Sequence, residues 1–84
     1  MTSITSIGQE IAEARRRQGM RQTDLAMQAR VSRATIDALE NARARDIGVS
    51  RLIRMLAALG LELNIRPSSD RRPTLDDLLK DDHD

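Results

Sequence analysis

The sequence has no cysteine and no aromatic residue, and its single histidine, His83, stands next to the last residue. Without thiols there are neither disulfides nor thiolate zinc sites, and one histidine has no second imidazole with which to share a metal ion. The absence of Phe, Trp and Tyr argues against the stacking platforms that bind single strands and unpaired bases. We therefore expect no metal and no cofactor, and duplex DNA is the better nucleic-acid candidate.

Long apolar runs are also missing. No segment approaches the roughly 18 apolar residues that span a bilayer, and the N-terminus lacks a basic region followed by an apolar one. We therefore expect a cytoplasmic protein with no membrane partner. We also expect no catalytic residues and no enzyme activity, because no histidine pairs with a nucleophile and no glycine-rich phosphate loop occurs.

The 84 residues carry a formal net charge of +1 that is unevenly distributed. Residues 1–66 contain 11 arginines and 7 acidic residues, a balance of +4, whereas residues 67–84 contain 3 basic and 6 acidic residues, a balance of −3. This predicts one small domain over 1–66 and an acidic tail over 67–84. The basic balance of the domain is consistent with phosphate binding and equally with a solvated surface.

Residues 22–41 have the apolar spacing of two short helices joined by a tight turn. Two apolar stripes can pack only if the helices cross: Leu25, Ala26 and Ala29 in the first, Ile36 and Leu39 in the second, with Val31 under the turn. Ser32 stands where an N-cap belongs. This is the pattern of a helix-turn-helix, and it leaves the outer face of the second helix free to meet base edges in a major groove. That face carries Arg33, Thr35, Asp37 and Ala38.

Two further helices are expected around this pair. A first helix should begin at Ser6, with Gln9 completing a capping box, and should end at Gly19. After a polar link over residues 42–48, an amphipathic repeat predicts a helix that ends at Gly60, with its inward face at Val49, Leu52, Ile53, Leu56 and Leu59. The fold class is therefore all-α, with four to five helices.

Residues 61–66 change to strict alternation, with Leu61, Leu63 and Ile65 on one face, which predicts a strand between Gly60 and Pro67. A lone strand leaves backbone donors and acceptors unpaired, and pairing with the same strand of a second copy would satisfy them. We therefore expect a homodimer with these three residues in its interface. The alternative is an extended arm that packs on its own helices.

Within the tail, residues 74–80 predict a short helix, with Thr74 as its N-cap and an apolar stripe at Leu75, Leu78 and Leu79. Helices under roughly 12 residues rarely persist in water without packing. We therefore expect this one to fold against a partner, or to dock on its own dimer.

The runs GMRQTDLA and VSRATIDALEN, followed by the fourth helix, resemble the Xre or phage-repressor type of helix-turn-helix protein over residues 7–60. The stretch LAALGLELNIRP resembles the HipB group, whose members are antitoxins of HipA-type serine/threonine kinase toxins. The resemblance implies a dimer with paired strands that binds an inverted-repeat operator in duplex DNA, represses its own operon and restrains the toxin.

The resemblance also implies roles for particular residues. The residues that face bases are Ser32, Arg33, Ala34, Thr35 and Ala38, and those that contact phosphates are Gln22, Asn41 and Arg43; Arg45 lies close enough to join the latter. Gln22 is implied to bond a residue of the recognition helix as well, and Arg15 and Glu40 are implied to form an ion pair between the first and third helices. Family members have threonine in place of Arg21 and glycine in place of Arg30, which predicts a strained or altered turn.

Two other functions remain open. A phage-type or restriction-modification controller would share the sequence up to Gly60 without a toxin partner. A pure protein-interaction module would retain the fold for packing alone, which the acidic Asp37 on the outer face favours. The basic residues Arg33, Arg43 and Arg45 around one helix favour DNA.

Overall fold

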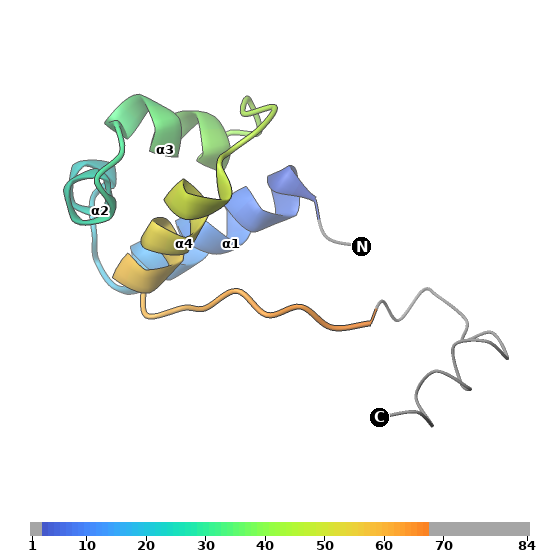
Figure 1. Cartoon of the computed structure of the whole chain (residues 1–84). Coiled ribbons are helices and arrows are strands. Elements are labelled where there is room, and N and C mark those ends of the chain that lie inside the picture. Colours follow the sequence, from blue (N-terminus) through green and yellow to red (C-terminus); the bar gives the residue numbers. More distant parts are fainter. Residues whose placement is uncertain (1–2, 68–84) are drawn as a thin grey trace, which may run out of the picture.

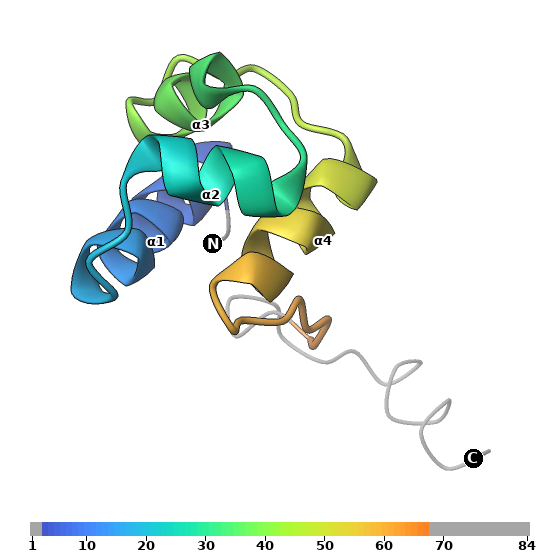
Figure 2. The ribbon, with the colours of Figure 1, turned by 90° about the vertical axis from the view of Figure 1, so that its left-hand side faces the viewer.

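The structure is a computed structural model that describes residues 3–67. This part contains four helices: α1 (Ile4–Arg17), α2 (Gln22–Ala29), α3 (Arg33–Glu40) and α4 (Val49–Ala58). In Figure 1, α3 lies above α1 and α4, and the view in Figure 2 shows α2 between α1 and α4. Within residues 3–67, none of these helices is long and apolar enough to cross a membrane.

The four helices share one core. Its largest fully buried side chains come from every helix: Ile11 of α1, Leu25 of α2, Ile36 and Leu39 of α3, and Met55 of α4. Ala26 and Ala29 are buried with them, and Val31 packs against this cluster from the turn between α2 and α3. The predicted crossing of two apolar stripes is therefore confirmed.

The inward face of α4 differs from the prediction. Leu52, Met55 and Leu59 are buried, whereas Val49 and Ile53 are 63% and 49% exposed. At 100° per residue, Ile53 lies about a third of a turn away from the centre of the buried stripe. The predicted period is confirmed, with Leu52 and Leu59 buried and Leu56 packed against the core. The predicted inward face is wrong at Val49 and Ile53, where α4 exposes part of its apolar surface.

The start of α1 also differs from the prediction. The helix begins at Ile4, where the backbone N–H of Ser6 donates to Ser3 Oγ at 3.1 Å and the N–H of Ser3 donates to Ser6 Oγ at 2.9 Å. Two serines thus form the reciprocal cap one turn earlier than the pair expected at Ser6 and Gln9. The other boundaries are confirmed, since Gly19 and Gly60 follow the ends of α1 and α4 with positive φ.

Residues 61–67 leave the helical body as an extended segment (Figure 1). No strand occurs within residues 3–67, so the helical part of the predicted fold class is confirmed and the strand stays a prediction. Ile65 is 95% exposed, and Leu61 and Leu63 are also exposed. The helix expected at 74–80, with Leu75, Leu78 and Leu79, lies outside the described residues.

Gly8 is a buried residue at which α1 approaches α3 closely, and the sequence pattern did not predict this contact. A Cβ atom built at Gly8 would lie 2.0 Å from the carbonyl oxygen of Leu39. The backbone of α1 therefore touches the C-terminal half of α3, and only a residue without a side chain permits this approach. The contact fixes the distance between α1 and α3.

We predict that Gly8→Ala destabilises the fold by about 3 kcal/mol, because the added methyl group must push α3 away from α1. Gln9→Ala, one position along on the exposed side of α1, should stay within about 0.5 kcal/mol of the parent protein. Urea unfolding followed by circular dichroism measures both. Equal stability of the two variants would contradict the close approach of α1 and α3.

Candidate nucleic-acid interface

One face of α3 is anchored in the core and the other is open. Ile36 and Leu39 are buried, whereas Arg33 and Ala34 are exposed and Thr35 and Ala38 are half-buried. The predicted cap is present, since the N–H of Thr35 donates to Ser32 Oγ at 3.0 Å. All five residues expected to face bases therefore lie at the start of α3 or along it.

The two departures noted in the sequence flank α2: Arg21 precedes the helix, and Arg30 begins the turn to α3. Arg30 has φ 58°, the left-handed conformation that glycine adopts more easily, at a cost of about 1 kcal/mol. Arg54 of α4 donates from Nε to the carbonyl of Ala29 at 2.8 Å and so supports the end of α2. At the start of α2, Asp24 accepts the N–H of Arg21 at 2.9 Å. The turn is thus strained, and it is supported by α4.

A bidentate ion pair joins α1 to α3. Arg15 donates from Nε and a terminal nitrogen to Glu40 at 2.7 and 2.9 Å, and the two side chains are only 11% and 2% exposed. Arg15 also donates to the carbonyl of Met20 at 2.8 Å. Burial raises the pKa of Glu40, but the hydrogen bonds and charge of Arg15, with a hydrogen bond from Gln22, outweigh it and lower that pKa. The ion pair implied by the resemblance is confirmed.

Gln22 connects the start of α2 to the same face of α3. Its amide nitrogen donates to Glu40 Oε1 at 3.1 Å and to Asp37 Oδ1 at 3.3 Å. The implied bond between Gln22 and a residue of the recognition helix is therefore present. The amide also links the buried carboxylate of Glu40 to the half-exposed carboxylate of Asp37.

Asp37 is the polar centre of this surface, a role that the sequence reading missed. Besides Gln22, its carboxylate accepts a hydrogen bond from Asn41 Nδ2 at 3.0 Å and pairs with the guanidinium of Arg43. The hydrogen bonds from Arg43 and Gln22 hold the pKa of Asp37 below its usual range, and the charge of Arg33 adds to this. The i, i+4 spacing of Asp37 and Asn41 could have indicated one of these contacts.

The chain reverses direction directly after α3. Ala42 has φ 59°, and the N–H groups of Arg43 and Ala44 both donate to the carbonyl of Ala38, at 2.8 and 3.1 Å. This turn carries Arg43 back beside Asp37. Three of the four residues expected to contact phosphates, namely Gln22, Asn41 and Arg43, therefore converge on one carboxylate, while Arg45 is exposed in the same loop.

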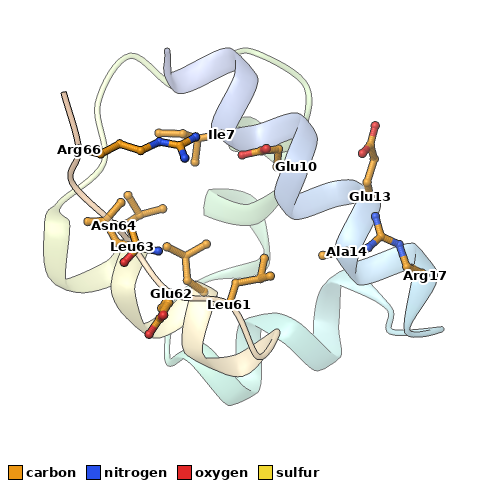
Figure 3. A pocket seen from close by; sticks show the side chains of 12 residues that line it. Ile7, Glu10, Glu13, Ala14, Arg17, Leu61, Glu62, Leu63, Asn64 and Arg66 are labelled. Atoms are coloured by element: carbon orange, nitrogen blue, oxygen red, sulfur yellow. The ribbon is translucent and has the colours of Figure 1, made fainter. Parts of the chain in front are cut away.

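A groove of about 580 Å³ lies between α1 and the extended segment 61–66 (Figure 3). Leu61 and Leu63 line it beside Ile7 and Leu56, with Glu13 and Arg17 on α1. Both ribbon views place the segment on the other side of the molecule from α3. Residues 3–67 contain no cluster of potential metal ligands. The described chain therefore has two separate surfaces, one around α3 and one along segment 61–66.

The crossed helices, the capped and exposed α3 and the arginines beside it define the class of helix-turn-helix proteins. Residues 2–68 match the family model of the helix-turn-helix domain, and the chain belongs to this family. This membership indicates DNA binding. No curated protein and no solved structure matches the chain.

Proposed function

We propose that the protein is a dimeric, sequence-specific repressor that binds duplex DNA, that it is also the antitoxin of a HipA-type kinase, and that it has no catalytic activity of its own. The observation that carries the proposal is the open face of α3, with Arg33 at its first turn and Arg43 and Arg45 in the loop that follows.

In this proposal α3 enters the major groove. The guanidinium of Arg33 has the donor geometry to read a guanine through O6 and N7. The small side chains of Ala34 and Ala38 allow close approach and contact with thymine methyl groups, and Thr35 supplies a hydroxyl. Gln22, Asn41, Arg43 and Arg45 contact the flanking phosphates, which set the position of α3 without reading sequence.

The first test separates base reading from phosphate contact. The operator is an inverted repeat with half-site centres roughly 34 Å apart or a multiple of it, recovered by selection from a randomised duplex pool. Arg33→Ala should cost about 1 to 3 kcal/mol on this operator and relax one base position. Arg43→Ala should weaken binding and flatten the salt dependence without relaxing any base position.

Arg17→Ala is the control, because Arg17 lines the groove beside segment 61–66 and not the surface around α3. Fluorescence anisotropy with operator and random duplexes measures all three variants. If Arg33→Ala and Arg43→Ala weaken both duplexes equally, Arg33 does not read a base.

The dimer is supported by the exposed apolar side chains. Six large apolar residues are exposed among the described ones, and all but Met27 lie on α4 or in segment 61–66: Val49, Ile53, Leu61, Leu63 and Ile65. Contiguous exposed apolar residues mark an interaction surface, and three of these five belong to the segment whose pairing we propose. Antiparallel pairing of two segments around a two-fold axis at Asn64 places Glu62 opposite the partner's Arg66 and Leu63 opposite the partner's Ile65. Opposite charges in facing positions stabilise such a pair.

The chain has no cysteine, so single cysteines report this register directly. Under oxidation Asn64→Cys should form a covalent dimer, because residue 64 faces its own copy across the two-fold axis. Glu62→Cys, two residues along on the same face, should remain uncrosslinked. Non-reducing electrophoresis measures both. A dimer in sedimentation that crosslinks at neither position would place the interface elsewhere.

The antitoxin role rests on the resemblance of residues 56–67 to the HipB group and on the apolar stripe in the acidic tail. Apolar anchors in a groove give a short helix its affinity, and the surrounding aspartates steer it towards a basic surface. We therefore assign toxin binding to Leu75, Leu78 and Leu79, in a segment outside the described residues.

Replacing Leu75, Leu78 and Leu79 with serine should leave operator affinity near normal and weaken binding to a HipA-type kinase from the adjacent reading frame at least tenfold, about 1.4 kcal/mol. Calorimetry with the kinase and anisotropy with the operator measure the two activities. Unchanged kinase binding would assign the contact to the helical body. No kinase binding by the parent protein would leave a regulator without a toxin.

A further inference from the structure

The polar network beneath the surface around α3 contains two carboxylates that differ in their surroundings. Glu40 is buried and accepts a bidentate pair from Arg15, whereas Asp37, one turn earlier on α3, is 30% exposed. Glu40 completes a contact between helices. Asp37 instead pairs with a side chain that is 61% exposed, the guanidinium of Arg43.

The donors that Asp37 holds are those expected to contact phosphates. Asn41 and Arg43 lie after the end of α3, and both side chains turn back to the Asp37 carboxylate. A phosphate oxygen makes the same charge-assisted bonds with guanidinium and amide groups that a carboxylate makes. A phosphate that recruits Arg43 must therefore displace Asp37 or share the guanidinium with it.

Asp37 also places a negative charge beside the surface that DNA would approach. The charge of Arg33, one turn earlier on α3, acts on the same carboxylate. A carboxylate in this position repels phosphates, and its mutual neutralisation with Arg43 removes one cation from those that a duplex can recruit. A duplex that binds through its phosphate backbone alone gains no base contacts that could offset this repulsion and the loss of one cation.

We infer that Asp37 is a specificity-determining residue, because its carboxylate keeps the donors of Arg43 and Asn41 away from phosphates. A phosphate replaces the Asp37 carboxylate only when base contacts hold α3 deep in the major groove. This inference rests on the proposed function. On random DNA, replacing the Asp37 carboxylate with a phosphate as the partner of Arg43 gains little binding free energy, because one anion takes the place of another. Arg43 therefore stays paired with Asp37. On the operator the contacts of Arg33 fix α3, and the exchange takes place.

The test replaces Asp37 with asparagine, which retains an oxygen acceptor for Gln22 and Asn41 and removes the charge. Asp37→Asn should raise the affinity for a random 20-base-pair duplex at least threefold and steepen its slope of log K against log salt by about 0.9, the contribution of one further phosphate. The affinity for the selected operator should rise less, so discrimination falls.

Two controls test whether the change in random-duplex affinity comes from the pairing of Asp37 with Arg43. Glu13→Gln removes the same charge in the groove beside segment 61–66, away from α3, and should change random binding little because screening acts over about 10 Å. In an Arg43→Ala background Asp37→Asn should raise random binding less than it does in the parent protein, because no guanidinium is left to release, and the difference between the two gains measures the coupling of Asp37 to Arg43.

Three results would overturn the inference: equal gains from Asp37→Asn and Glu13→Gln, an undiminished gain without Arg43, or parallel weakening on both duplexes with an unchanged salt slope, the result expected of a purely structural residue. Failure of the proposed function is distinct from these, because the parent protein would then show no salt-dependent duplex binding at all.

Discussion

The ion pair between Arg15 and Glu40 is the constraint on which the rest of the surface depends. It joins α1 to the end of α3 through two bonds shorter than 3 Å in a nearly solvent-free position. Removing one partner from such a pair leaves a buried charge and costs about 3 to 5 kcal/mol. Gln22 extends the network from Glu40 to Asp37, so one chain of polar contacts positions α1, α2 and α3. The open face of α3 is therefore presented by a rigid support.

Several close contacts supplement this ion pair because the core is small and contains no aromatic side chain. The backbone approach at Gly8 fixes α1 against α3, and Arg54 holds the end of α2 from α4. These directional contacts restrict the position of α3 more than apolar packing does, because the free energy of apolar burial does not depend on direction. They also explain how a left-handed Arg30 is tolerated in the turn, where its strain is supported from the neighbouring helix.

Periodicity predicted the helices and most of their buried residues, because one face of each helix must be apolar to pack. It failed where the outcome depended on contacts distant in sequence. Val49 and Ile53 have the correct spacing yet are exposed, since the phase of α4 is set by the helices it meets. Gly8 has no local role that a pattern could indicate. The convergence of Gln22, Asn41 and Arg43 on Asp37 follows from the turn at Ala42, whose positive φ no residue preference predicts. The ion pair of Arg15 and Glu40 was foreseen through resemblance alone.

The central claim is that α3 and the loop after it form the DNA-binding surface, and amide chemical shifts test it most directly. Nitrogen-15 spectra of the protein are recorded during titration with a duplex that carries the selected inverted repeat. The account predicts the largest shift changes in residues 32–45, with the groove-lining residues Glu13 and Arg17 nearly unchanged. Changes centred on that groove, with α3 unaffected, would contradict it.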